Sequence, residues 1–323
     1  ERSCACIYLY FSINQANMSA IVFPGQGSQY KEMAMDFNDN FNIAKNIFQE
    51  IEDSTKINIR KIIHENQDDK LNQTNFTQLA IFSASTVIYK TLIDQIGLDI
   101  INPKIVLGHS LGEYSALVAN NVLKIHDAAN LIKKRGELMN SAIKPNLSGM
   151  AAIIGKDSSY ITDVIMKNNL NIEIANDNSP IQVVVSGLID EINASENVFL
   201  EKGVKKYIKL NVSAAFHSKF MNEAESELSS EIDKYTFSST NIPIISNFNA
   251  SINSESGDII SSLKSQMSKK VKWTESIKTL ENSDISEIIE IGPGKILSGL
   301  ISRISNKFVI KSVDKIKDLE KFN

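Results

Sequence analysis

The sequence predicts an α/β protein with an α/β-hydrolase-like core of parallel strands and an inserted ferredoxin-like subdomain. First, short apolar runs such as residues 21–23 and 105–107 alternate with amphipathic helical stretches, as in parallel sheets covered by helices. Second, the run at 105–107 leads into G-x-S-x-G at residues 108–112, the pattern of a sharp strand-to-helix turn. Third, residues 149–212 have the order strand, helix, strand, strand, helix, strand, which indicates a ferredoxin-like unit.

The order of these elements divides the chain into a core and an insertion. We expect residues 18–144 and 213–323 to form the hydrolase-like catalytic domain and residues 145–212 to form the ferredoxin-like subdomain. Because the insertion interrupts the larger domain, the seam between the two is a natural place for a cleft. Residues 1–17 contain both cysteines and precede Met18, and we interpret them as an extension outside the core.

The individual elements of the insertion and of the last third of the chain are predicted from apolar spacing. Alternating apolar residues predict strands, and a 3.6-residue repeat predicts helices. In the insertion, strands are expected at 150–154, 172–175, 181–186 and 206–212, helices at 158–167 and 189–202, and a turn at 176–180. Further strands are expected at 243–246 and 288–291, followed by a turn at 292–294 and a last helix.

Composition and charge exclude several classes of protein. The 323 residues are 42% hydrophobic and 22% charged, which fits a globular chain with a sizeable core. A net charge of −4 gives no reason to expect binding to nucleic acid or to a membrane surface. No apolar run reaches the roughly 20 residues of a membrane-spanning helix. No Cys/His pattern has the spacing of metal ligands, so we expect no metal.

Ser110 is the candidate nucleophile. It is flanked by Gly108 and Gly112, which a sharp strand-to-helix turn requires because neighbours without a Cβ allow the backbone to turn closely. The turn lifts the serine hydroxyl clear of the sheet edge. The helix that begins beside it presents unpaired N–H groups where an oxyanion would form. The backbone N–H of Leu111 is therefore the expected oxyanion donor.

Of the four histidines, His217 is the candidate general base for the serine. It follows alternating apolar residues over 208–212 and precedes a helical stretch, so it is expected at the end of a strand, where sites of α/β proteins assemble. A structural role for this histidine is the alternative. The side chain of His109 is expected to point away from the serine, His64 to lie in a polar loop, and His126 to be a helix cap or a surface residue.

Arg135 is predicted to face the protein interior. Winding residues 128–142 as a helix places this arginine at the centre of an apolar stripe that includes Met139, with Lys133 and Glu137 on the opposite face. A buried guanidinium needs a carboxylate or a phosphate to meet its planar fork. Two interpretations follow, an ion pair with an acid of the protein or a clamp for a substrate carboxylate.

Gln26 lies in a glycine-containing loop directly after the first predicted strand. The loop, GQGSQ at residues 25–29, lacks the lysine and the spacing of a nucleotide-binding loop, so no nucleotide site is predicted. At the carboxyl end of a strand, such a loop either supplies a second oxyanion donor or is simply a tight turn.

Six motifs follow one another from Met18 to the last predicted helix. They are FPGQGSQ at 23–29, GHSLGEYSAL at 108–117, RGELM at 135–139, MAAIIG at 150–155, AFHS at 215–218 and IGPGKILSGL at 291–300. In type and order, they resemble the motifs of the malonyl-CoA:acyl carrier protein transacylases of type II fatty acid synthesis. The resemblance implies the fold expected above and a ping-pong acyltransferase that uses a CoA thioester as substrate and needs no cofactor.

The resemblance also implies a role for each matching residue. Ser110 matches the acylated nucleophile, and His217 matches the general acid/base. Gln26 matches the glutamine of the oxyanion hole, beside the N–H of Leu111. Arg135 matches the arginine that binds the malonyl carboxylate.

Four further residues are expected at the site on the same ground. Gln266 matches a glutamine whose main chain orients the histidine in place of a triad aspartate. Asn178 matches an asparagine that lines the cleft. Met139 and Phe216 are expected to contact the substrate, and the bulk of Phe216 would leave little space for a 2-methyl branch.

The implied partners are malonyl-CoA and an acyl carrier protein. We expect a monomer in the bacterial cytoplasm, with a plastid as the alternative. Because acyl carrier proteins are acidic, a group of lysines is either a docking patch or a set of solvated side chains. These are Lys205, Lys206, Lys269, Lys270 and Lys272. The rival functions are a serine hydrolase or thioesterase, an acyltransferase of a polyketide pathway, and a carrier-binding module without catalysis.

Overall fold

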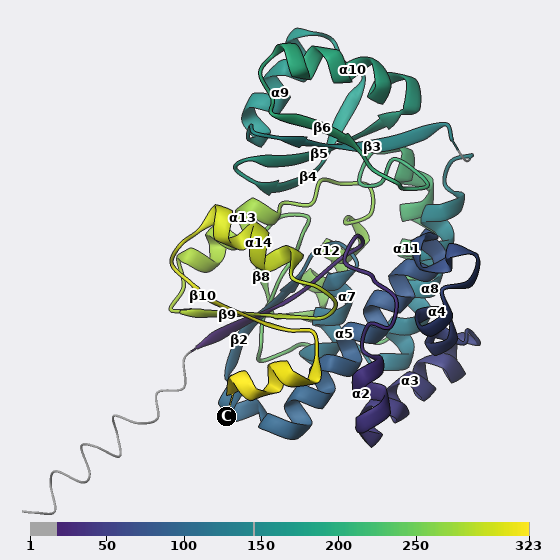
Figure 1. Ribbon diagram of the computed structural model, residues 1–323, viewed down its shortest axis with the longest axis vertical. Coiled ribbons are helices and arrows are strands. Elements are labelled where there is room, and N and C mark those ends of the chain that lie inside the picture. Colours follow the sequence, from purple (N-terminus) through teal and green to yellow (C-terminus); the bar gives the residue numbers. More distant parts are fainter. Residues whose placement is uncertain (1–17, 145, 323) are drawn as a thin grey trace, which may run out of the picture.

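Two β-sheets organise the protein, whose computed structural model describes residues 18–144 and 146–322 (Figure 1). The expected extension over residues 1–17 lies outside the described residues. Within the described part, the larger sheet has the order β10-β9-β1-β2-β7-β8, and only β8 runs antiparallel to its neighbour. The strands are β1 (Ser19–Phe23), β2 (Pro103–Gly108), β7 (Ile244–Ile245), β8 (Ile252–Asn253), β9 (Glu287–Ile291) and β10 (Val309–Val313). The chain is thus a mixed α/β protein with a core of parallel strands, as predicted.

Helices cover this sheet on both faces (Figure 1). Those before the smaller unit are α2 (Met35–Asn40), α3 (Asn42–Thr55), α4 (Ile59–Glu65), η1 (Gln67–Asn72), α5 (Thr74–Ile96), α6 (Leu98–Ile101), α7 (Gly112–Ala119) and α8 (Ile125–Ser141). Those after it are η2 (Lys219–Met221), α11 (Asn222–Ile232), α12 (Ser256–Lys264), α13 (Trp273–Glu281), α14 (Ile296–Ile304) and η3 (Ile316–Phe322). The predicted turn at 292–294 precedes α14, the last α-helix of the described residues, and only β10 and the short 3₁₀ helix η3 follow it.

The strand β1 shows why the core strands appear in the sequence as continuous apolar runs. Ile21 and Phe23 pack into the cluster formed with α3, α5 and α8. Ala20 and Val22 point to the opposite face and pack with residues of α13 and α14, including Trp273. Because successive side chains alternate between two covered faces, every residue of this strand is buried.

The helix α5 is buried at the centre of the larger unit. In length and composition it is long and apolar enough to cross a membrane, and it is the only such helix of the described residues. However, 83% of its most apolar stretch is buried inside the protein. Its neighbours are α3, α7 and α8, so we interpret it as the core helix on which the others pack.

The smaller unit has its own sheet, in the order β4-β5-β3-β6 with every pair antiparallel. Its elements are β3 (Ser148–Ile154), α9 (Ser158–Lys167), β4 (Ile172–Ser179), β5 (Gln182–Leu188), α10 (Ile189–Glu201) and β6 (Lys206–Lys209). The two helices lie on the outer side of this sheet, away from the larger unit (Figure 1). The order of elements is the predicted one, and the bounds of α9 are those expected.

Two predicted boundaries in the smaller unit are wrong by three residues or more, and others differ by one or two. The turn expected at 176–180 is mostly strand, because β4 continues to Ser179. It does so beside the larger unit: the Val271 N–H donates to Ala175 at 2.8 Å, and the Asp177 N–H donates to Val271 at 3.0 Å. β6 stops at Lys209 rather than at residue 212, because the chain bends there and the Val212 N–H bonds back to Leu210.

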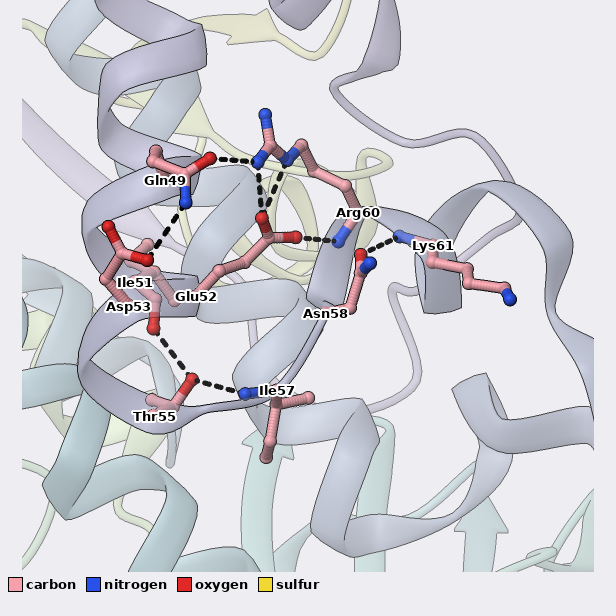
Figure 2. Close-up of polar contacts among 9 residues, drawn as sticks. All are labelled: Gln49, Ile51, Glu52, Asp53, Thr55, Ile57, Asn58, Arg60 and Lys61. Carbon is pink, nitrogen blue, oxygen red and sulfur yellow. Dashed lines mark hydrogen bonds and ion pairs between the residues drawn. The ribbon is translucent and has the colours of Figure 1, made fainter.

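A polar corner joins α3 to α4, well away from the strand ends of the larger sheet (Figure 2). The chain leaves α3 through Lys56, which is in the left-handed region at φ = 59°. Arg60 forms an ion pair with Glu52, and its guanidinium also donates to Gln49 at 2.6 Å. Asn58 caps α4 by accepting the Lys61 N–H at 3.0 Å. These polar contacts therefore join the end of α3 to the start of α4, while apolar residues of both helices, such as Ile51 and Ile59, lie in the main core.

Candidate active site

The sharp turn at residues 108–112, called the elbow below, forms at the carboxyl end of β2 and carries Ser110. Ser110 has φ = 52°, a left-handed conformation that a residue with a side chain adopts only under constraint. A Cβ on Gly108 would overlap the backbone of Gly112, and a Cβ on Gly112 would overlap the carbonyl of Phe23. The two glycines of the motif are therefore required by close backbone approach, and the turn they permit presents Ser110 to a cavity.

Asn247 clamps this elbow, and the sequence analysis did not identify it. Its Oδ1 accepts the Ser110 N–H at 2.6 Å, and its Nδ2 donates to the Gly108 carbonyl at 2.6 Å. One side chain thus satisfies two backbone groups of a strained turn. Asn247 follows β7 by two residues and belongs to no recognisable motif. Only the pairing of β7 with β2 brings it to the elbow.

Ser110 and His217 are in contact although 107 residues separate them. The Ser110 Oγ lies 2.8 Å from the His217 Nε2. The His217 Nδ1 lies 3.1 Å from the main-chain oxygens of both Gln266 and Lys269. Because a carbonyl oxygen only accepts, Nδ1 carries the proton, which leaves Nε2 to accept from the serine hydroxyl.

His217 does not project from a strand end, so that expectation is wrong. β6 ends at Lys209 and η2 begins at Lys219, which places the histidine in the connecting loop. Its backbone is in the left-handed region, at φ = 54°. The two main-chain acceptors, rather than a strand, hold the ring in place.

The surroundings of His217 keep its ring neutral. The residue is 4% exposed. Burial, the charge of Arg135 and the nearby His109 together lower the pKa of His217 to about 3, against the opposing effect of its two carbonyl acceptors. The ring is therefore neutral at pH 7, which is the state in which a histidine can act as a general base.

We therefore expect the His217 ring to remain neutral, with its proton on Nδ1, from pH 8 down to about pH 4. Its pKa is lowered by burial, so protonation begins only well below the ordinary histidine value of about 6.5. ¹⁵N-histidine NMR over this range measures both the charge and the tautomer, and the His217→Gln variant assigns the signal. A His217 signal that titrates near pH 6.5 would contradict this description of the base.

Arg135 is on the inner face of α8, 1% exposed, as its place in the apolar stripe predicts. Its Nη1 donates to Gln78 Oε1 at 2.6 Å, and its Nη2 donates to Ser110 Oγ and to Gln266 Oε1, both at 3.0 Å. Its Nε is buried and has no partner among the described residues. No ion pair within residues 18–144 and 146–322 includes Arg135, so it is not held by an acid of the protein there.

Two glutamines hold the guanidinium, and only one of them was expected at the site. Gln78, on α5, accepts from Arg135 and donates through Nε2 to the Met139 sulfur at 3.2 Å. Gln266 accepts from Arg135 with its side chain and from His217 with its main chain. Two neutral amides and the Ser110 hydroxyl accept from the Nη atoms, so no acid of the described residues makes an ion pair with this buried guanidinium.

One expected oxyanion donor, Leu111, lies in the elbow next to Ser110, and the other, Gln26, follows the neighbouring strand β1. Leu111 directly precedes α7 and is 1% exposed. The N–H groups at such a helix start have no acceptor one turn earlier. Gln26 follows β1, the neighbour of β2, and lines the same cavity as Ser110. Its side-chain Nε2 donates to Thr74 Oγ1 at 3.4 Å, so its backbone N–H is the candidate donor.

A cavity of about 390 Å³ opens at the seam between the two units. Asn178 lies in it with His109, whose Nε2 is 2.8 Å from the Asn178 Oδ1. Arg135 and Gln266 are not among the residues that line the cavity, but both form hydrogen bonds with Ser110. The larger unit contributes Gln26, Ser110, Met139, Phe216, His217 and Leu300 to the cavity wall, and the smaller unit contributes Met150, Ala152, Asn178 and Val184.

The remaining histidines lie elsewhere. His64 belongs to the last turn of α4 rather than to a polar loop, and its Nδ1 is 3.5 Å from Glu32. His126 lies near the start of α8, where it contacts Asp127 at 3.3 Å, as expected of a surface residue. Among the residues that the structure describes, no group of three His, Cys, Asp or Glu is arranged to hold a metal ion.

The fold and the site together define an α/β protein in which a serine hydroxyl contacts a neutral histidine ring, with a buried arginine beside them. The chain matches the acyl transferase domain family over residues 20–307, and it belongs to that family. It is similar to the malonyl CoA-acyl carrier protein transacylase of Bacillus subtilis, with 34% identity over 304 residues that cover 93% of this chain and 95% of the relative.

Solved structures extend this similarity to the fold. An acyl carrier protein S-malonyltransferase from Vibrio cholerae superimposes with a TM-score of 0.89 at 32% identity, covering 94% of this chain and 99% of that one. A second structure, PlMCAT:AntF, is described as a type II PKS acyl-carrier protein in complex with its malonyl-transacylase. It has a TM-score of 0.90 at 30% identity and covers 94% of this chain and 98% of that one.

Proposed function

We propose that this protein transfers a malonyl group from malonyl-CoA to the phosphopantetheine thiol of an acyl carrier protein, with Ser110 as the acylated nucleophile. The names of the relatives support the donor and the acceptor. The observation that carries the assignment is the environment of Arg135. It touches the nucleophile, keeps an unpaired Nε and has no acidic partner, so a carboxylate on the acyl group would complete its contacts.

In the first half-reaction, the Ser110 Oγ attacks the thioester carbonyl of malonyl-CoA, and His217 Nε2 accepts the hydroxyl proton. The bond from Arg135 Nη2 to Ser110 Oγ stabilises negative charge on that oxygen as the proton leaves. The N–H groups of Gln26 and Leu111 stabilise the tetrahedral oxyanion. The carbon–sulfur bond then breaks, and the CoA sulfur takes the proton from His217 to leave as a thiol.

In the second half-reaction, the phosphopantetheine thiol gives its proton to His217 and its sulfur attacks the malonyl-Ser110 ester. The carbon–oxygen bond breaks, and Ser110 recovers its proton from the histidine. The Gln266 carbonyl stabilises the charged imidazole in both half-reactions, because it accepts from Nδ1 throughout. Gln266 takes the place that an aspartate has in a triad.

Three residues of the cavity wall are proposed to contact the substrate. Asn178 holds His109 and presents its amide to the cleft. Met139 and Phe216 supply apolar contacts beside Ser110 and His217. Phe216 would disfavour a 2-methyl branch, an effect worth about 1–3 kcal/mol for one methyl group.

The lysines expected at a carrier-protein surface do not form one patch. Lys206 is on β6, whereas Lys269 to Lys272 lie beside β4 at the opposite edge of the smaller sheet. We propose the group at 269–272 as the docking region, because the main chain of Lys269 contacts His217 and the segment borders the seam. Within this group, the Lys272 Nζ lies 3.6 Å from the Glu275 Oε2, so this lysine forms an ion pair with an acid of the protein.

The proposal includes the expected domain organisation. The order β4-β5-β3-β6 with two helices on one face supports a ferredoxin-like subdomain at 145–212. The elbow at the end of β2 supports a hydrolase-like core at 18–144 and 213–323. The proposal also takes the protein to be a monomer. The bacterial relatives support the cytoplasm rather than a plastid.

A hydrolase of the same type would pass the malonyl group to water instead of a thiol. Incubation with malonyl-CoA alone, followed by intact-protein mass spectrometry and peptide mapping, separates the two. We expect a stable malonyl adduct on Ser110, which a thiol acceptor then removes. Steady release of CoA without an adduct would contradict the proposal in favour of hydrolysis. If neither an adduct nor CoA release is observed, the result would contradict the proposal and favour a binding module.

A further inference from the structure

A buried carboxylate lies directly behind the nucleophile, and the reaction described above does not use it. Glu113 is in the first turn of α7, three residues after Ser110, and it is 2% exposed. No ion pair of the described residues includes it. Burying an acid without a paired charge is costly, so its hydrogen bonds need an explanation.

Three residues donate hydrogen bonds to Glu113, and two of them, Gln266 and Asn247, support the site; the third is Ser246. Its Oε2 accepts from Gln266 Nε2 at 2.7 Å, across 153 residues of sequence. The same oxygen accepts the backbone N–H of Asn247 at 3.2 Å. Asn247 clamps the elbow, and Gln266 contacts both Arg135 and His217. One carboxylate is therefore bound to both supports of the reacting groups.

The contacts of Gln266 require one orientation of its terminal amide. Its Nε2 donates to two acceptors, the Ser110 carbonyl at 2.9 Å and the Glu113 carboxylate. Its Oε1 is thereby free to accept from Arg135. If the amide rotated by half a turn, its NH₂ would face the arginine donors and its oxygen would face two acceptors. A terminal amide torsion has little preference of its own, so these neighbours decide it.

We infer that Glu113 is a positioning residue, whose carboxylate fixes the Gln266 amide in the orientation that holds Arg135 for the acyl group. An ionised carboxylate only accepts hydrogen bonds, so it allows only the NH₂ side of Gln266 to face it. The inference rests on the proposed function, because it concerns the group that would bind the malonyl carboxylate. Burial raises the pKa of Glu113 to about 7, against the hydrogen bonds from Gln266, Asn247 and Ser246 and the charge of Arg135, so the ionised form predominates at pH 8.

The first test compares Glu113→Met with Glu113→Gln at pH 8, using the ratio of kcat/KM for malonyl-CoA to that for acetyl-CoA. Met removes both oxygens at a similar length, and we expect the ratio to fall about 10- to 100-fold. Gln keeps an oxygen in the place of Oε2, and we expect its ratio to stay within about 3-fold of the wild-type value. The control is Glu52→Met, which loses a partly buried acid at the α3–α4 corner and should leave the ratio unchanged.

A ratio unchanged in Glu113→Met, or equal losses for both donors, would overturn the inference, since a residue important only for folding changes both alike. Should Glu113→Met not fold, Glu113→Asp is the second variant. It stays charged but withdraws the acceptor from Gln266, and it should lower the same ratio. An unchanged ratio in that variant would also overturn the inference.

The second test is a double-mutant cycle of Glu113→Met with Gln266→Met, which keeps the main-chain acceptor of His217. If Glu113 acts through the Gln266 side chain, the double variant loses no more selectivity than Gln266→Met alone. Additive losses would overturn the inference. The same cycle measured by thermal unfolding needs no substrate. It therefore tests the Glu113–Gln266 coupling even if the wild-type protein fails to transfer malonyl. Such a failure would contradict the proposed function and not this inference.

Discussion

Replacing Ser110 with alanine is expected to lower kcat/KM for malonyl transfer at least about 10³-fold and to abolish the covalent adduct. The reason is the geometry of the elbow. The Ser110 Oγ is the atom that lies 2.8 Å from His217 Nε2 and 3.0 Å from Arg135 Nη2, so its loss removes the nucleophile while the base and the arginine remain. Rates are measured by transfer to acyl carrier protein, and the adduct is measured by intact mass.

The matched control for this variant is Ser115→Ala. Ser115 is a buried serine of α7, the helix that follows Ser110, and its hydroxyl has no partner in the described part of the chain, so the same change is made nearby without touching Ser110 or His217. It should keep turnover within a few-fold of the wild-type value. Wild-type turnover in Ser110→Ala, or a malonyl adduct that maps to another residue, would disprove the assignment of the nucleophile.

Replacing Arg135 with alanine is expected to lower kcat/KM for malonyl-CoA by roughly 10²- to 10³-fold, the cost of removing one partner of a buried charge pair. Transfer from acetyl-CoA should change far less or increase, because acetyl carries no carboxylate to pair with the guanidinium. The hydrogen bond from Arg135 to Ser110 is lost for both donors alike. The informative measurement is therefore the ratio of the two kcat/KM values.

Arg135→Lys provides the control that keeps the charge. Lysine cannot reproduce the three contacts that two guanidinium nitrogens make with Gln78, Ser110 and Gln266, so we expect only partial recovery of malonyl transfer. Full recovery would mean that charge alone suffices. Equal losses for malonyl and acetyl in Arg135→Ala would instead mark the arginine as a structural residue.

Much of the fold follows from local patterns. The covered faces of the parallel sheet make β1 and β2 nearly continuous apolar runs, which periodicity detects. α9 begins and ends where its apolar repeat predicts, with Asp157 capping it by accepting the Tyr160 N–H at 2.8 Å. The boundary of β4 was misjudged, because polar residues extend that strand only through contact with Val271 in a distant segment.

The candidate site was predictable where the chemistry lies within a motif. Ser110, Leu111 and Gln26 sit at turns whose glycines are visible in the sequence, and the inward position of Arg135 follows from helical spacing. The supporting residues were not predictable in this way. Gln78 looks like one polar residue of an apolar helix, and Asn247 looks like a loop residue, because their partners are separated from them by 57 and 137 residues.

By itself, therefore, the sequence determined the α/β class, the elbow that carries Ser110 and the direction in which Arg135 faces, since each depends on neighbours within one turn or one helix. Only the tertiary structure decided what those groups do together. It brought a loop histidine onto the serine, gave the histidine two carbonyl acceptors, and surrounded the arginine with neutral amides instead of an acid. The physical reason is that proton position and charge at the site depend on partners that pack together only when the two sheets and their connecting loops have folded.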